Sequence, residues 1–120
     1  MLLTKVLLTK TQREKLLSNG ARRAKSLDGG FDPEPVVKLF TPDANATWLL
    51  TELDPDDEDI AFGLCDLGMG FPELGCVRLS KLENIRGPNG LHVERDEFFK
   101  ADKPISAYAE DARANQGIRP

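Results

Sequence analysis

The stretch that decides the fold runs from residue 36 to residue 79 and reads VVKLFTPDANATWLLTELDPDDEDIAFGLCDLGMGFPELGCVRL. Apolar and β-branched residues fill four short segments of it, and proline, glycine, asparagine and aspartate fill the gaps. Because the connections are short, consecutive strands should pair as antiparallel neighbours. The pattern predicts strands at residues 36–41, 46–53, 60–67 and 73–79.

The second predicted strand indicates how side chains divide between the two faces of the sheet. Successive residues of a strand point to opposite faces. The predicted faces carry Thr47, Leu49, Thr51 and Leu53 on one side, and Trp48, Leu50 and Glu52 on the other. Because Glu52 is charged, we expect the second face to open to solvent near the end of the strand.

Helical signals precede the strands. Thr9 and Thr11 each begin a capping-box spacing, so a helix should start at one of them. The dipeptide Asn19-Gly20 is predicted to interrupt this helix or to end its first part, because glycine is a common helix stop. The first helix carries most of the basic residues of the N-terminal quarter.

More elements follow the four strands. Ser80 begins another capping-box spacing and predicts a short helix near residues 80–86. Residues 91–94 predict a short fifth strand, and Ser106 is predicted to cap a final helix that Gly117 ends. The elements together predict one α+β domain. Its central antiparallel β-meander of about four to five strands is packed by an N-terminal helix, a C-terminal helix and the short helix.

Length and composition bound the class of protein. With 120 residues, 40% of them hydrophobic and 30% charged, the chain suits one soluble globular domain. No apolar run reaches the length of a transmembrane helix, and the N-terminus lacks the pattern of a secretory signal. The tetrapeptide LLTK occurs at residues 2–5 and 7–10. We expect residues 1–8 to form an N-terminal extension and residues 9–117 to form the domain.

The chain has few residues of the types that most often act as nucleophiles or metal ligands, with two cysteines and one histidine. Cys65 and Cys76 lie eleven residues apart, which is neither a zinc-ligand nor a redox spacing. Both fall in predicted strands, so we expect reduced core thiols and a cytoplasmic protein. Nothing places His92, the only histidine, beside either sulfur. Gly68 and Gly70 lack the rest of a phosphate-loop pattern. We assign no catalytic residue, metal ligand or cofactor.

Charge is unevenly distributed along the chain, whose net charge is −4. Residues 1–30 hold seven basic and two acidic residues. Residues 31–75 hold one basic and eleven acidic residues, and residues 76–120 hold eight basic and seven acidic residues. This layout fits either a plain solvated surface or an acidic face that docks on a basic partner. Direct nucleic-acid binding is disfavoured, because aromatic residues make up only 7% of the chain and none lies in the basic helix.

The preferred hypothesis is a non-enzymatic binding protein that docks on a basic protein surface through an acidic face. Charge complementarity would raise the association rate. Two aromatic side chains would join this surface if they proved to be exposed together. The candidate residues are Glu52, Asp54, Asp56, Asp57, Glu58, Asp59, Asp66 and Glu73, with Trp48 and Phe71 as the aromatic pair.

The alternative hypothesis is a small metal-dependent hydrolase or nuclease. Carboxylates at strand ends could hold Mg²⁺ if at least three of them converged. The acidic run that begins at Asp54 does not fit a calcium loop, because its sixth position is Asp59 and its twelfth is Cys65. The carboxylates that would have to converge are Glu52, Asp54, Asp66 and Glu73.

Five segments form a specific series: PVVKLFTP at 35–42, TWLLTELDP at 47–55, AFGLCDLG at 61–68 followed by Gly70, PELG at 72–75 and DKPISAY at 102–108. Over roughly residues 7–116 the chain resembles a family of small bacterial proteins known only as a domain of unknown function. The family is often encoded on plasmids and other mobile elements, sometimes near anti-restriction genes. The resemblance implies no catalytic residue. It favours an accessory protein of mobile elements, with an anti-restriction or anti-defence role as its most specific form.

Overall fold

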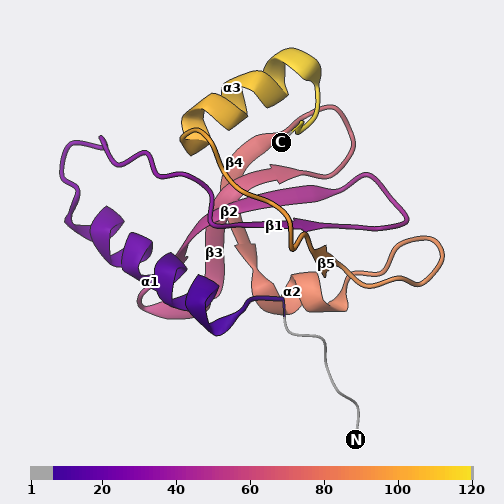
Figure 1. The fold of residues 1–120 in the computed structure, drawn as a ribbon, viewed down its shortest axis with the longest axis horizontal. Coiled ribbons are helices and arrows are strands. Elements are labelled where there is room, and N and C mark those ends of the chain that lie inside the picture. The colour runs from indigo at the N-terminus through magenta and orange to yellow at the C-terminus, as the bar shows by residue number, and fades with distance from the viewer. Residues whose placement is uncertain (1–6, 120) are drawn as a thin grey trace, which may run out of the picture.

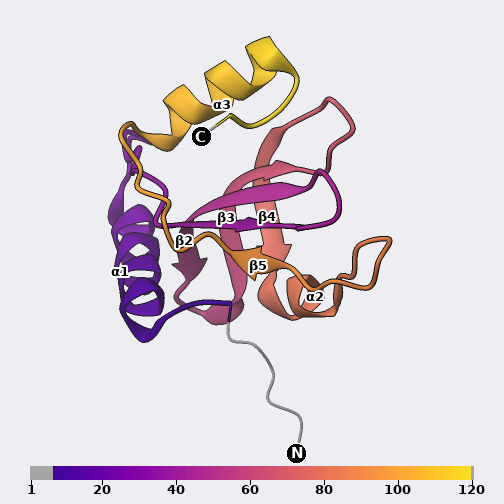
Figure 2. The same cartoon turned by 45° about the vertical axis from the view of Figure 1, so that its right-hand side comes forward.

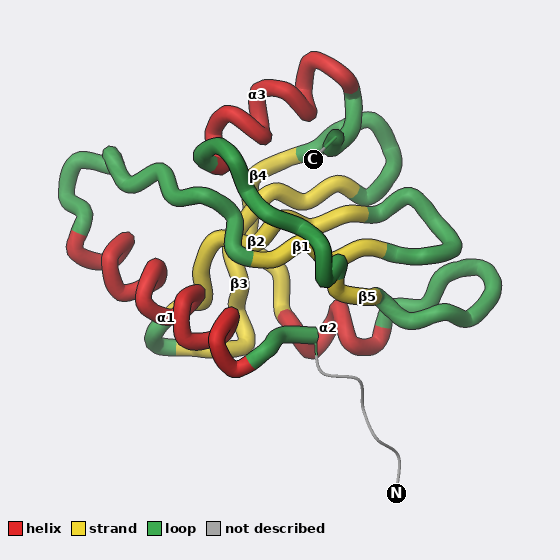
Figure 3. Tube along the Cα trace, in the orientation of Figure 1, coloured by secondary structure: helices red, strands yellow, loops and turns green. Residues whose placement is uncertain are grey.

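The part of the chain that the structure describes folds into a five-stranded antiparallel sheet with three helices, which confirms the predicted α+β class (Figure 1). The computed structural model describes residues 7–119. The strand order is β4-β3-β2-β1-β5, so β2 is the central strand and β4 and β5 are the edges (Figure 3). The elements are α1 (Lys10–Lys25), β1 (Val37–Phe40), β2 (Thr47–Asp54), β3 (Asp57–Asp66), β4 (Glu73–Arg78), α2 (Leu79–Asn84), β5 (Glu94–Arg95) and α3 (Ile105–Asn115).

Two hydrophobic clusters lie on the two faces of β2. The larger one joins Trp48 and Leu50 to Leu16 of α1 and to the leucines of α2. The smaller one joins Leu49 and Leu64 to the apolar face of α3. Figure 2 shows α3 on the opposite side of the sheet from α1 and α2. Since both faces of β2 are covered, its residues from Trp48 to Leu53 are all buried.

A β-bulge at Thr51 shifts the alternation of side chains in β2. Leu50 pairs with Gly63 and Glu52 pairs with Phe62, so Thr51 is the extra residue. The prediction for this strand was wrong beyond the bulge. Leu53 joins the cluster of Trp48 and Leu50 instead of that of Leu49, and Glu52 is only 5% exposed instead of opening to solvent.

Helix α1 packs on the part of β2 that extends beyond its pairing with β1. The pairing of β1 with β2 ends at Leu50, and α1 covers the next part of β2. Asn19 Nδ2 donates a 2.9 Å hydrogen bond to the carbonyl oxygen of Thr51. A Cβ atom on Gly20 would lie 1.8 Å from the carbonyl oxygen of Leu53. The predicted break at Asn19-Gly20 was therefore wrong. The pair lets the helix backbone approach the strand.

The ends of the helices confirm some of the predicted caps and correct others. Thr9 and Gln12 form the predicted capping box of α1, with both hydrogen bonds at 3.0 Å. The predicted caps Ser80 and Ser106 were wrong, because both serines lie inside the helices and the N-cap residues are Arg78 and Pro104, neither of which makes a side-chain cap hydrogen bond. Gln116, with φ of 57°, ends α3 in place of Gly117.

The outer boundaries also differ from the predictions. β3 begins at Asp57, three residues earlier than predicted, and β5 is displaced to Glu94–Arg95. Leu7 and Leu8 are buried in the larger cluster, so the folded domain includes them. The rest of the predicted extension, residues 1–6, lies outside the described residues. Within residues 7–119, no helix has the length and apolar character needed to cross a bilayer.

The contact between α1 and β2 predicts an unusual response to a helix-stabilising change. Gly20→Ala should favour the isolated helix by about 1 kcal/mol, because alanine has the higher helix propensity. The new Cβ would collide with the Leu53 carbonyl, and relief of such overpacking costs about 1–3 kcal/mol. We expect a net loss of unfolding free energy in urea titrations.

Gly75→Ala is the matched control, because no atom lies within 4 Å of the Cβ position at Gly75. A Gly20→Ala protein as stable as wild type would contradict this account of how α1 docks.

Candidate functional site

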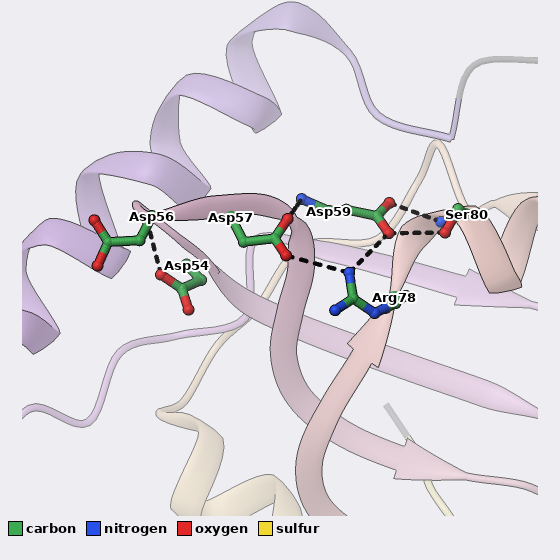
Figure 4. Close-up of polar contacts among 6 residues, drawn as sticks. All are labelled: Asp54, Asp56, Asp57, Asp59, Arg78 and Ser80. Atoms are coloured by element: carbon green, nitrogen blue, oxygen red, sulfur yellow. Dashed lines mark hydrogen bonds and ion pairs between the residues drawn. The ribbon is translucent and has the colours of Figure 1, made fainter.

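The acidic connection is a tight hairpin, and three of its five carboxylates lie in β3. The turn itself is Pro55-Asp56. Asp57, Glu58 and Asp59 are therefore strand residues, and the prediction that they belong to the loop was wrong. Asp54 accepts a 2.8 Å hydrogen bond from the backbone N–H of Asp56 and fixes the turn (Figure 4). The acidic side chains are therefore held on a rigid hairpin.

Two of these carboxylates, those of Asp57 and Asp59, form ion pairs or hydrogen bonds with Arg78 and Ser80 (Figure 4). Arg78 Nη1 lies 3.2 Å from Asp57 Oδ2 and 3.5 Å from Asp59 Oδ2. The Asp59 carboxylate also accepts from the backbone N–H of Ser80 at 2.9 Å and from its hydroxyl at 2.7 Å. Asp57 and Asp59 thus tie β3 to the end of β4 and to the first turn of α2.

Two basic residues of α1 form ion pairs with two further carboxylates. Arg23 Nε lies 2.5 Å from Glu52 Oε2, and the hydroxyl of Thr51 donates to Glu52 Oε1 at 3.0 Å. Arg13 lies 3.7 Å from Glu58, and both of these side chains are exposed. Within residues 7–119, the hairpin carboxylates without an ion pair are therefore those of Asp54 and Asp56.

Asp66 and Glu73 lie at the other end of β3 from the hairpin. A ten-residue strand spans on the order of 30 Å, so the predicted acidic face is two separate regions. Asp66 is buried and accepts from the backbone N–H groups of Gly68 at 2.8 Å and Ile118 at 3.0 Å. It joins the β3–β4 loop to the segment after α3.

The four carboxylates of the hydrolase hypothesis do not converge. Glu52 is paired with Arg23, Asp66 is bound by two backbone N–H groups, and the hairpin lies a strand length away from Glu73. Among the described residues there is no group of three or more histidine, cysteine or acidic side chains that could hold a metal ion.

The two aromatic candidates are not exposed together. Trp48 is 2% exposed and belongs to the core, whereas Phe71 is 78% exposed. Phe71 shares the β3–β4 loop with Leu67 and Met69, which are also exposed. The backbone of this loop turns at Gly68 and Gly70, whose φ values are 77° and 86°.

An apolar strip on the sheet face beside edge strand β4 was not predicted. Ile60 and Phe62 of β3 are half-buried and belong to neither core cluster, and their neighbours Leu74 and Cys76 are exposed. Two shallow hollows of about 250 and 310 Å³ share Ile60 and Cys76. We call Ile60, Phe62, Leu74 and Cys76 the β4 strip. The available signal was that residues 73–79 end the meander and therefore form an edge.

The β4 strip lies between the two regions considered above. By register, Ile60 pairs with Arg78 near the acidic hairpin, and Cys65 pairs with Glu73 near the apolar loop. Among the described strands β4 pairs with β3 alone, so its outer backbone groups have no strand partner there. Unpaired edge groups beside apolar side chains are the features that an added strand recognises.

The two cysteines should differ in reactivity. The prediction that both are core thiols was wrong for Cys76, which is exposed on β4. Burial, and secondarily the nearby Cys76, raises the pKa of the Cys65 thiol to about 11. Because the thiolate is the reactive form, a thiol-specific reagent should modify Cys76 rapidly and Cys65 slowly at mildly alkaline pH.

Stopped-flow absorbance and mass spectrometry would measure the two rates. Cys76→Ser should remove the fast phase, and Cys65→Ser should leave it. Two equally fast thiols in the folded protein would contradict the placement of Cys65.

The Asp59 carboxylate should make stability depend on pH. The hydrogen bonds from the hydroxyl and then the N–H of Ser80, with a smaller effect of Arg78, lower the pKa of Asp59. Because the folded-state pKa lies below the unfolded value, this stabilisation is complete above the unfolded pKa and is lost as the pH falls through the folded one.

We therefore expect Asp59→Asn to lower the urea midpoint at neutral pH. The difference from wild type should shrink below about pH 4. Asp56→Asn is the control and should change the midpoint little at either pH, because the Asp56 side chain has no ion pair within residues 7–119. An Asp59→Asn protein with an unchanged midpoint at neutral pH would contradict the role given to this carboxylate.

Comparison with known proteins places the chain in a family without assigning it a function. No curated protein and no solved structure matches it. The family described as "Protein of unknown function (DUF2958)" matches residues 7–119, which is nearly the whole chain. The protein therefore belongs to the DUF2958 family of proteins of unknown function.

Proposed function

We propose that the protein acts by binding another protein and not by catalysis. The observation that carries the proposal is the β4 strip, an apolar surface beside an unpaired edge strand. Soluble monomers rarely expose contiguous apolar surface unless it serves for recognition. The partner would add an extended segment to β4, with main-chain hydrogen bonds to the edge and apolar side chains on Ile60, Phe62 and Cys76.

The partner is proposed to present a basic surface. Asp54 and Asp56 lie at the hairpin end of β3, close to the Arg78 end of β4, and keep their negative charge unpaired in the described part of the chain. A basic residue at one end of the partner's segment would meet these carboxylates. Such complementarity raises the association rate and fixes the direction in which the partner binds.

The most specific form of this proposal follows from the resemblance to proteins of mobile elements. The protein would be an accessory that blocks the basic nucleic-acid groove of a defence or restriction nuclease. The hairpin supports this form only through its charge. The metal-dependent hydrolase alternative receives no support, because Glu52 and Asp66 are engaged within the fold.

The test is affinity purification of the tagged protein from a lysate of its host at low and moderate salt, followed by mass spectrometry. We expect a stoichiometric partner that dissociates as the salt concentration rises, because exposed charges are screened. Asp56→Lys/Glu58→Lys should weaken its binding at least tenfold, and Leu74→Lys should do the same through the β4 strip. The partner should also slow alkylation of Cys76.

The matched control is Glu97→Lys/Glu110→Lys, which makes the same change in charge at two exposed positions away from the hairpin and from β4. Its binding should equal that of wild type. Equal binding by all variants, or no stoichiometric partner at low salt, would contradict the proposal.

A further inference from the structure

A second surface lies between α1 and the connection to β1, away from β4. Helix α1 and residues 26–34 line an open hollow of about 770 Å³. Its volume is within the range of small-molecule sites. The side chains that line it are mainly polar, and Asn19, which also holds α1 on β2, lies at its base.

The wall opposite α1 is fixed at several points. Asp32 accepts hydrogen bonds from the backbone N–H of Ser106 at 3.0 Å and from its hydroxyl, which anchors the wall to the first turn of α3. The carbonyl of Pro33 accepts from the N–H of Ile105 at 2.9 Å. The guanidinium of Arg22 lies 4.8 Å from the ring centre of Phe31. The hollow is thus formed in advance of any ligand.

Three basic residues of α1 line the hollow. Lys15 and Arg22 are seven residues apart, and Lys25 follows three residues later, so they lie on one side of the helix. Within residues 7–119 none of the three forms an ion pair. Arg13 and Arg23 on the same helix are each paired with a glutamate, so between Arg13 and Lys25 the basic groups of this helix without an ion pair in the described chain are those that line the hollow.

Unlike the three basic side chains, two of the three carboxylates that line the hollow accept hydrogen bonds within the fold. Asp28 accepts from the N–H of Gly30 at 3.0 Å and from the hydroxyl of Ser26 at 3.2 Å. Both oxygens of Asp32 are bound by Ser106. Glu34 has no hydrogen bond or ion pair in the described chain. The acceptors of the hollow are therefore mostly occupied within the fold, whereas the ammonium and guanidinium donors are available.

We propose that this hollow binds a phosphorylated small molecule of nucleotide size. Its phosphate oxygens would accept hydrogen bonds from Lys15, Arg22 and Lys25, and a hydroxyl or amino group would donate to Glu34. Arg22, which already stacks on Phe31, offers the planar donors that suit phosphate. Because the charges of Asp28 and Asp32 remain nearby, a singly charged anion would bind weakly, and more than one phosphate is required.

The experiment titrates the full chain with ATP, inorganic triphosphate and adenosine by calorimetry at low ionic strength. We expect ATP and triphosphate to bind and adenosine not to bind. Tighter binding of ATP than of triphosphate would show that the nucleoside contributes, and equal binding would show that the phosphates suffice. Either result supports the site.

Charge-removing variants locate the site on the protein. Lys15→Gln/Arg22→Gln/Lys25→Gln should lower the affinity for ATP at least tenfold. Lys15→Gln/Lys25→Gln, which keeps the contact of Arg22 with Phe31, should lower it severalfold, and thermal unfolding checks that both proteins fold. The control removes three exposed lysines elsewhere, Lys10→Gln/Lys81→Gln/Lys100→Gln.

No binding of ATP or triphosphate by the wild-type protein would overturn the proposal. An equal loss in the control would also overturn it, because binding would then depend on total charge and not on the hollow. The proposal is independent of the proposed protein partner, and neither result would change the other.

Discussion

The junction of α1 with the bulged part of β2 is the contact on which the rest of the structure depends. The bulge at Thr51 turns Leu53 into the larger cluster, and the pairing of β2 with β1 ends at Leu50, before the Thr51 and Leu53 carbonyls. Asn19 supplies a donor for the Thr51 carbonyl, and Gly20 allows the backbones to approach. A buried carbonyl group without a hydrogen-bond partner destabilises the folded state. The bulged part of β2 therefore depends on α1 for its stability.

This junction also determines where the charges of the chain meet. Docking of α1 on β2 carries Arg23 to Glu52 and Arg13 to Glu58, so the basic first quarter of the sequence partly neutralises its acidic middle. The rest of the basic helix turns toward the connection to β1. The separation of charge along the sequence thus becomes ion pairs of Arg13 and Arg23 on one side of α1, and Lys15, Arg22 and Lys25, without an ion pair in residues 7–119, on the other.

Local patterns predicted the elements better than the site. Alternation and turn residues were sufficient for the four main strands, and the Thr9–Gln12 capping box was correct because both partners are local. The Ser80 and Ser106 caps were wrong because α2 and α3 begin earlier, after Arg78 and Pro104. The N–H groups and hydroxyls of the two serines are bound instead by carboxylates distant in sequence, Asp59 and Asp32. The burial of Glu52 depends on a bulge and on a helix that returns to cover it, and no periodicity encodes either.

The β4 strip follows from how the helices are distributed over the sheet. Both faces of β2 are covered, by α1 and α2 on one side and by α3 on the other, and α3 reaches Leu49 and Leu64 but not Ile60 and Phe62. On that face α3 therefore does not cover the part of the sheet next to β4, where the guanidinium of Arg23 lies 5.2 Å from the ring centre of Phe62. Exposed apolar groups on an unpaired edge favour aggregation unless another chain occupies them. Their presence beside a rigid acidic hairpin thus favours recognition over an incidental gap in packing.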